Sequence, residues 1–283
     1  MGWFTYNIEK YSPQQLVVIP LVLFVISLVV LASTMLATGM PVTPGIDFSG
    51  GTAVTLITSD SNDQLKATFA DYPLSEISDM NNGKFLKFGT MEDKNYQALS
   101  QLISEKYPDA KIDQIGESFG KSLQSQAAIA LLFSFIGMAI VIFLTFRTFV
   151  PSVAVVLSAL ADMVMTAAVM NIVGIPLSLG TTAALLMLIG YSVDSDILLT
   201  NRVLKRQGKL NDKLMGAFHT GMIMTSTTFA AITALFLVSW FGSVQILMEI
   251  SAVLLIGLVA DILNTWLTNV GILKWYILKG GGK

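Results

Sequence analysis

Long apolar runs and one polar interval alternate along the chain. Residues 39 to about 125 are mixed and polar, whereas the other long stretches are dominated by aliphatic and aromatic side chains. The apolar runs cover residues 16–37, 127–146, 152–173, 178–200, 220–240 and 245–272. Each is near or above the roughly 20 residues that a helix needs to cross the hydrocarbon of a bilayer. The pattern predicts an all-α membrane bundle of six helices, with a folded domain inserted after the first helix.

Strand-like and helix-like patterns alternate within the polar interval. β-Branched or alternating side chains predict strands over residues 51–58, 84–88 and 111–115, with room for one more around 74–80. Apolar residues at helical spacing predict helices over residues 61–71 and 92–107. We expect a small two-layer α+β domain, ferredoxin-like in its broad plan.

Basic residues are distributed unevenly between the two ends of the predicted helices. The short loops at about 174–177 and 241–243 contain none. The opposite end carries Lys10, Arg147, Arg202, Lys205, Arg206, Lys209, Lys213, Lys274, Lys279 and Lys283. By the positive-inside rule we expect a multi-pass protein of the cytoplasmic membrane, with both termini in the cytoplasm and Arg202 as a cytoplasmic anchor.

This orientation divides the chain into four parts. Residues 1–38 form the N-terminus and first membrane helix, 39–125 an extracytoplasmic domain, 126–273 membrane helices two to six, and 274–283 a cytoplasmic tail. The first apolar run is too long for the apolar part of a signal peptide and has no convincing cleavage site, so we expect it to be retained.

The composition excludes several classes of function. Of the 283 residues, 53% are hydrophobic and 13% are charged, against about 25% charged residues in soluble domains. The net charge of −2 argues against a nucleic-acid binder. The absence of cysteine excludes thiolate metal sites, and a single histidine argues against a histidine cage. No nucleotide-binding loop or nucleophile–base set is visible, so we expect no cofactor, no metal centre and no enzyme activity.

Four aspartates fall inside the predicted membrane helices. Asp194 and Asp196 lie in the fourth helix, while Asp162 and Asp261 lie midway along the third and sixth helices. At about 1.5 Å per residue, Asp194, Asp162 and Asp261 lie roughly 12, 16 and 20 Å from the cytoplasmic helix ends. A carboxylate at the centre of a membrane helix costs about 2.5–3.5 kcal/mol to insert, and no Lys or Arg lies at the same depth. We interpret the four aspartates as a proton or cation relay, whose carboxyls are neutral when sealed and ionised when wetted.

Structural interpretations compete with this assignment. Asp194 and Asp196 could lie near a helix end and reach water. Asp162 and Asp261 could be protonated acids that bond across helices to Ser or Thr and serve packing alone. His219, near the cytoplasmic start of the fifth helix, is either solvated or a helper in the relay.

Two motifs stand out in the chain. One is Gly-Ile-Asp-Phe-Ser-Gly-Gly-Thr at 45–52, and the other is Gly-Tyr-Ser-Val-Asp-Ser-Asp at 190–196, followed by Asn201-Arg202. Together they resemble the SecF family, the protein-export membrane subunits of the SecD/SecF pair in the resistance-nodulation-division superfamily. We interpret Gly45, Asp47, Gly50 and Gly51 as a structural motif. Its glycines would allow a tight turn with positive φ, and Asp47 would bind backbone N–H groups of that turn.

The resemblance implies half of a two-part transporter that assists protein export with the proton gradient. The partners it implies are a SecD subunit, a SecY-type translocation channel, unfolded preprotein and membrane lipids. The tail from Asp261 to Tyr276 resembles archaeal versions, for which no cytoplasmic ATPase motor is expected.

The fourth helix departs from the bacterial pattern. Bacterial relatives usually show Asn-Asp where this chain has Asp194-Ser195, and Asp-Arg where it has Asn201-Arg202. The proton-carrying carboxylate would therefore be shifted onto Asp194, with Asp196 as an addition. Because one residue turns a helix by about 100°, the sequence leaves open which of the two faces the bundle, and also whether the coupled ion is H⁺ or Na⁺.

Other functions remain in competition. A small-molecule or lipid exporter of the same superfamily usually has two halves and larger outer domains. A non-transporting scaffold predicts that Asp194 and Asp196 are dispensable. An intramembrane protease is remote, because the expected Gly-x-Gly-Asp setting is absent around Asp162, Asp194 and Asp261.

Overall fold

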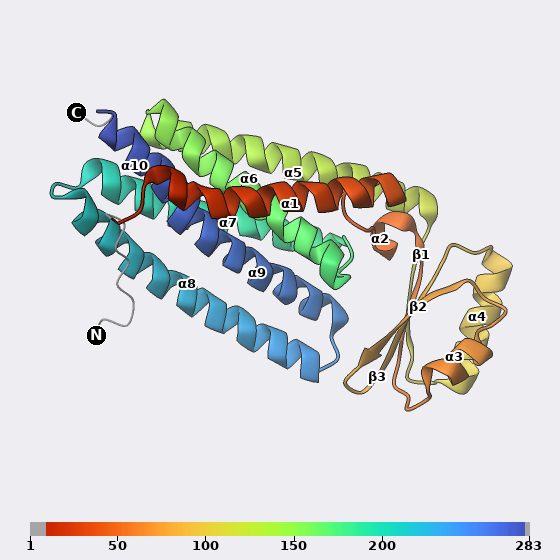
Figure 1. Cartoon of the computed structure of the whole chain (residues 1–283). Helices are drawn as coiled ribbons and strands as arrows, with labels where there is room; N and C mark the ends of the chain where they lie inside the picture. The colour runs from red at the N-terminus through yellow and green to blue at the C-terminus, as the bar shows by residue number, and fades with distance from the viewer. Residues whose placement is uncertain (1–9, 281–283) are drawn as a thin grey trace.

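The membrane part is a bundle of six long spans. The computed structural model describes residues 10–280, and six of its spans are long and apolar enough to cross a membrane. The first five are α1 (Pro13–Thr38), α5 (Glu117–Phe146), α6 (Phe149–Val173), α7 (Leu179–Lys205) and α8 (Leu210–Phe241). The last span combines α9 (Gln245–Leu263), a π-helical segment (Asn264–Asn269) and α10 (Val270–Leu278). The predicted helical membrane bundle is confirmed, and the start of α1 lies beside α10 (Figure 1).

Two helices begin earlier than the hydrophobic pattern indicated. Helix α5 begins at Glu117 rather than about 127, so the expected domain boundary at residue 125 falls inside it. Helix α8 begins at Leu210 rather than about 220. Hydropathy marks only the part of a helix that lies in lipid, and polar turns can continue the same helix beyond that layer.

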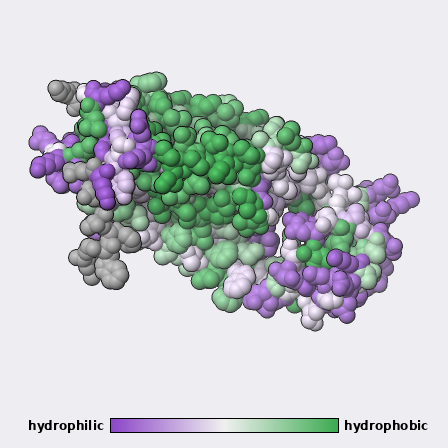
Figure 2. Space-filling model, viewed as in Figure 1, coloured by the Kyte–Doolittle hydropathy of each residue, from purple (hydrophilic) through white to green (hydrophobic). Residues whose placement is uncertain are grey.

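The bundle has an inner and an outer set of helices. More than half of the most apolar stretch of α6 and of α7 is buried, whereas α1, α5 and α8 are mostly exposed along theirs. On the face shown in Figure 2, the exposed side chains along the bundle are apolar, and polar residues gather at its two ends. This distribution is that of a protein whose outer helices face lipid.

The inserted domain is built on a four-stranded sheet. Its elements are β1 (Gly51–Leu56), α3 (Asn62–Thr68), β2 (Leu74–Met80), β3 (Gly83–Phe88), α4 (Asp93–Lys106) and β4 (Lys111–Ile115). The strand order is β2-β3-β1-β4 with antiparallel neighbours. Helices α3 and α4 lie on the face of the sheet that points away from the bundle, and they bury a core that includes Leu86, Phe88 and Leu99 (Figure 1). The additional strand expected around residues 74–80 is present as β2.

The glycine-rich motif joins the bundle to this domain. It forms a short helix, α2 (Ile46–Ser49), followed by Gly50 at φ 75° and Gly51 at φ 132°. A Cβ on Gly50 would lie 2.8 Å from the Glu117 Cα, so the close approach of the first turn of α5 also requires glycine there. The motif therefore fixes the path of the chain between the bundle and the sheet.

Asp47 has a different partner from the one predicted. Its Oδ2 accepts a 2.7 Å hydrogen bond from the backbone N–H of Leu179, the first residue of α7, rather than from its own turn. Gly45 N donates to Leu177 O at 2.8 Å, and Leu177 N donates to Thr43 O at 2.8 Å. The prediction was wrong because the free N–H groups at the start of α7 lie next to the motif in space, although far away in sequence.

Candidate functional site

The two aspartates of α7 lie on opposite sides of the helix. Asp196 is completely buried, whereas Asp194 is exposed. Two positions turn a helix by about 200°, so only one of these carboxyls can face the interior. The structure places Asp196 among the inner helices and Asp194 on the outer face, in a groove that Arg202 and Met224 also line.

Asp162, on α6, is held by donors from two other helices. Its Oδ2 accepts a 2.5 Å bond from Ser192 Oγ on α7, and its Oδ1 accepts a 2.7 Å bond from Asn264 Nδ2 at the start of the π-helical segment. All three side chains are buried. Both carboxyl oxygens therefore have a donor, which is the arrangement that a buried carboxylate requires.

Asp196 and Asp261 share one hydroxyl. Thr265 Oγ1 lies 2.9 Å from Asp196 Oδ1 and 3.0 Å from Asp261 Oδ1. A hydroxyl carries one hydrogen, so both contacts can be hydrogen bonds at once only if one of the carboxyls is protonated and donates to Thr265. Which carboxyl is protonated thus decides to which acid Thr265 donates its hydrogen bond.

Ser195 also has more acceptors within reach than its single hydroxyl hydrogen can serve as donor, and one of them is Asp261. Its Oγ lies 2.9 Å from the carbonyl oxygen of Ser192, and 3.0 and 3.1 Å from the two carboxyl oxygens of Asp261. If Ser195 donates to the carbonyl, Asp261 must supply the hydrogen of the second bond. Hydroxyls that can reverse their direction therefore connect α7 with the last membrane span.

The π-helical segment brings several of these groups to one side. Asn264, Thr265 and Asn269 all lie in it, and all three bond to Asp162 or Asp196. A π turn holds more residues than an α turn and so changes which side chains share a face, and such segments are common at functional sites. The irregular turn thus accounts for the convergence of three polar side chains on the acids.

The salt bridges do not reach this network. Within residues 10–280, they join partners in the inserted domain or in the first turns of α5. Arg202 instead binds α8, with Nη1 2.6 Å from Gly216 O and Nη2 2.8 Å from Thr220 Oγ1. His219 is exposed on α8 and is not a member of the network. The buried acids are therefore held by hydroxyls and amides.

Three of the four aspartates predicted from the sequence lie in the network, but the side chains that bond to them were not predicted. The missed residues are Ser192, Ser195, Asn264, Thr265 and Asn269. One usable signal was present, since Asp261, Thr265 and Asn269 recur at i, i+4 and i+8 along the last apolar run. Such a stripe places polar groups on one helix face.

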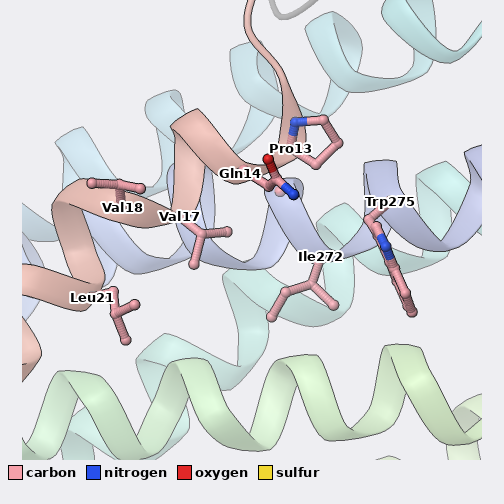
Figure 3. Close-up of a pocket in the computed structure, with 8 residues that line it drawn as sticks. Pro13, Gln14, Val17, Val18, Leu21, Ile272 and Trp275 are labelled. Carbon is pink, nitrogen blue, oxygen red and sulfur yellow. The ribbon is translucent and has the colours of Figure 1, made fainter.

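The groove between the first and last membrane spans lacks this chemistry. The groove between α1 and α10 is lined by Pro13, Gln14, Val17, Val18, Leu21, Gly271, Ile272 and Trp275, with no acid or base among them (Figure 3). Within the part of the chain that the structure describes, no three His, Asp or Glu side chains form a group that could hold a metal ion.

Comparison with known proteins identifies the family. A family model described as the C-terminal part of the protein export membrane proteins SecD/SecF matches residues 95–279. The protein-export membrane protein SecF of Methanolacinia petrolearia is 58% identical, over 99% of this chain and 100% of that protein. The chain belongs to the SecF family. The SecF of Haloferax volcanii is 40% identical over 96% of this chain and 95% of its own length, and the resemblance inferred from the two motifs is confirmed.

Solved SecDF structures share the fold of this SecF chain. The crystal structure of SecDF from Thermus, a translocon-associated membrane protein, superposes with a TM-score of 0.73 at 20% identity. It is matched over 96% of this chain and 40% of its own length. SecDF in its super-membrane-facing form gives a TM-score of 0.63 at 18% identity, over 99% of this chain and 40% of its own. The chain thus spans about 40% of the SecDF chains that it resembles.

Proposed function

We propose that this chain is the SecF subunit of a SecD–SecF complex that assists protein export across the cytoplasmic membrane, driven by the proton gradient through Asp162, Asp196 and Asp261. One observation carries the mechanism. Carboxyls from three membrane spans meet in a buried network whose hydroxyls can serve only one acid at a time. Ionisable groups in such a position are typical of proton pathways.

Proton movement would be coupled to helix contacts through these hydroxyls. When Asp196 or Asp261 gains or loses a proton, Thr265 and Ser195 must reverse their hydrogen bonds, and the contact between α7 and the last span changes. A proton that crosses the membrane yields about 2.3 kcal/mol per 100 mV. That energy is comparable with one or two hydrogen bonds at about 1 kcal/mol each.

The outer domain would receive the motion through the start of α7. The connector, residues 39–50, includes the start of the glycine-rich motif. Its Asp47 binds the first N–H of α7, and its Thr43 and Gly45 bind Leu177 just before that helix. A shift of α7 would therefore move the connector and the sheet behind it. The β-α-β-β-α-β order with its β2-β3-β1-β4 sheet supports a ferredoxin-like description of this domain. The distribution of basic residues supports cytoplasmic termini and an extracytoplasmic position for residues 39–125.

The expected partners follow from the family. The likeness to SecDF, and the share of those chains that this chain spans, support a SecD subunit that supplies the other half. A SecY-type channel, unfolded preprotein and lipids are the remaining proposed contacts. We propose no enzymatic step and no cofactor. We further propose that His219 is solvated and that Asp194 lies outside the relay.

Reconstitution with the partner subunit tests this function. Proteoliposomes that contain the channel, the partner and this chain would be given a preprotein, with and without an imposed proton gradient. We expect the gradient to accelerate release of the preprotein, and we expect Asp196→Asn and Asp261→Asn to abolish the acceleration. Asp194→Asn, with the same chemical change on the outer face of the same helix, should retain most of it.

Two results would contradict the proposal. Full acceleration by both Asp196→Asn and Asp261→Asn would remove the acids from the mechanism. An equal loss in Asp194→Asn would mean that a carboxylate on the outer face, rather than the buried network, determines the coupling.

A further inference from the structure

The groove between α1 and α10 is long, narrow and apolar. It has a volume of about 480 Å³, and all but one of the side chains that line it are apolar. Leu21, Ile272 and Trp275 extend to the same side of the two helices (Figure 3). On α1 the lining residues run from Pro13 to Leu21, which is about 12 Å at 1.5 Å per residue. The groove therefore follows α1 from the basic end of the bundle into the layer of the membrane hydrocarbon.

The dimensions of this groove fit one lipid chain. One leaflet of the hydrocarbon is about 15 Å thick, half of the roughly 30 Å of the whole core. A groove about 12 Å long matches the depth to which an acyl chain extends from the interface. A helix with its side chains is about 10–12 Å across, so a helix of a partner would lie across the groove rather than inside it.

Two lysines lie at the end of the groove. The Lys279 ammonium is 4.6 Å from the centroid of the Trp275 ring, which lines the groove. Lys274 Nζ donates a 2.6 Å hydrogen bond to the carbonyl oxygen of Tyr11, two residues before Pro13. Neither α1 nor α10 contains an Asp or a Glu. The two helices that form the groove therefore supply positive charge at its end and no acid to balance it.

An apolar groove with a cationic end is complementary to a lipid with an anionic headgroup. Basic pockets between membrane helices on the cytoplasmic side bind such headgroups. Tryptophan is enriched at the boundary between hydrocarbon and headgroups, and Trp275 is 43% exposed beside Lys279. A zwitterionic headgroup brings a cation of its own towards the lysines, so it gains less from them.

We propose that the groove between α1 and α10 binds one anionic phospholipid of the cytoplasmic leaflet. An acyl chain lies along Val17, Leu21 and Ile272, and the phosphate lies beside Lys274 and Lys279. The lipid thereby joins the first and last membrane spans at the surface of the bundle. The site rests on the proposed function only for the cytoplasmic orientation of this end, because binding requires neither a gradient nor the partner subunit.

Lipid binding to the full chain tests the site. The detergent-purified chain is titrated with dioleoyl phosphatidylglycerol and, separately, with dioleoyl phosphatidylcholine, which has the same chains and a zwitterionic headgroup. Native mass spectrometry counts the retained lipids, and thermal unfolding gives the midpoint. We expect one saturable phosphatidylglycerol site that raises the midpoint, with phosphatidylcholine weaker by about fivefold or more. Glycerol phosphate, which has the phosphate but no acyl chains, should not compete.

Two pairs of variants assign the binding to the groove. Lys279→Gln should weaken phosphatidylglycerol binding by about fivefold, the effect of one lysine near a membrane surface. Its control, Lys209→Gln, removes the same charge from an exposed position between α7 and α8 and should have no effect. Leu21→Trp fills the groove and should abolish the saturable site. Leu28→Trp makes the same change at another exposed leucine of α1, outside the groove, and should retain the site.

Three results would overturn the site. Equal affinity for the two lipids would mean that the groove accepts any acyl chain. Equal losses in Lys279→Gln and Lys209→Gln would assign the preference to the overall positive charge of this end of the bundle. Loss of the site in the complex with SecD would assign the groove to a helix of the partner. Gradient-dependent export is a separate question, because Asp196→Asn should bind phosphatidylglycerol as the unmodified chain does.

Discussion

At the scale of single residues, hydroxyl and amide groups rather than basic side chains hold the buried acids of the described residues. Asp162 accepts from Ser192 and Asn264, while Thr265 lies between Asp196 and Asp261. An arginine would donate only, and it would keep its partner ionised. A hydroxyl can donate or accept, so the same contacts remain available when a carboxyl changes its protonation. This arrangement allows a change of charge without the loss of a helix contact.

The sequence makes the acids visible but not their partners. Asp162 and Asp261 stand out because a carboxylate in an apolar run is costly. Ser192 and Ser195 do not, because serine is tolerated in membrane helices through a bond to its own backbone. Only the packing of α7 against α6 and the last span distinguishes a serine that donates a hydrogen bond to an acid from one that donates to the backbone of its own helix.

Tyr107 provides a pH-dependent prediction outside the membrane. Burial and the 2.6 Å hydrogen bond to Asp60 Oδ2 raise the pKa of Tyr107 from 10.0 to about 12. A pKa raised on folding means that this stabilisation is complete below pH 10 and is lost as the pH rises towards 12. Tyr107→Phe keeps the ring beside Phe69 and loses the bond, at a cost of about 1–2 kcal/mol near neutral pH.

The measurement is thermal unfolding of the full chain over a series of pH values. The stability difference between the unmodified chain and Tyr107→Phe should be constant up to about pH 10 and should shrink above it. A difference that grows with pH would contradict the assignment of the hydrogen bond.

At the scale of elements, the orientation of α7 resolves a question that the sequence left open. Asp194 and Asp196 are two residues apart, and the apolar pattern around them is compatible with either one facing inward. The polar face of the last span decides for Asp196, because Thr265 and Asn269 lie opposite it. That face depends on the π-helical segment, and hydrophobic spacing alone does not predict where a helix changes from α to π geometry.

The π-helical segment packs closely on α8 and tolerates little added volume. A Cβ on Gly221 would lie 2.4 Å from Trp266 Cζ2, and the Trp266 ring is buried against Phe218 with 5.0 Å between ring centroids. We expect Gly221→Ala to destabilise the chain by about 1–3 kcal/mol, as overpacking does. It should also reduce gradient-dependent export, since Trp266 is adjacent to Thr265.

Thermal unfolding in detergent and the reconstituted export assay measure the two effects. Gly137→Ala is the control, because nothing lies within 4 Å of a Cβ at that position of α5. It should be neutral or slightly stabilising. A Gly221→Ala chain as stable as Gly137→Ala would show that Trp266 can move at little cost.

A second prediction at this scale concerns the hydrogen bond between the connector and the start of α7. Asp47 Oδ2 binds the first backbone N–H of α7, so Asp47→Ala leaves that group without its acceptor and should cost about 1 kcal/mol, as other lost helix caps do. Asp47→Asn retains a side-chain oxygen and should cost less. Unfolding midpoints, with limited proteolysis of residues 39–50, compare the two, and equal effects would exclude the capping role.

At the scale of the whole molecule, the chain combines an apolar helical bundle with a polar inserted domain. On the face shown in Figure 2, the bundle is apolar along its length, while the inserted domain and the opposite end of the bundle are polar. Hydropathy therefore predicts the six spans and the inserted domain. It does not predict how they join, because the contacts of the connector with Asn171, Leu177 and Leu179 pair residues that are distant in sequence.

The orientation of the molecule in the membrane can be tested directly, because the chain contains no cysteine and any introduced thiol is the only one. Lys94 is exposed on α4 of the inserted domain, and Gln207 is exposed in the short connection between α7 and α8. The basic residues around Gln207 favour the cytoplasmic side. We expect a membrane-impermeant maleimide to label Lys94→Cys in intact cells, and to label Gln207→Cys only after the membrane is opened. Because both positions are exposed, failure to react reports the side of the membrane rather than burial, and labelling of Gln207→Cys in intact cells would invert the whole assignment of the outer domain.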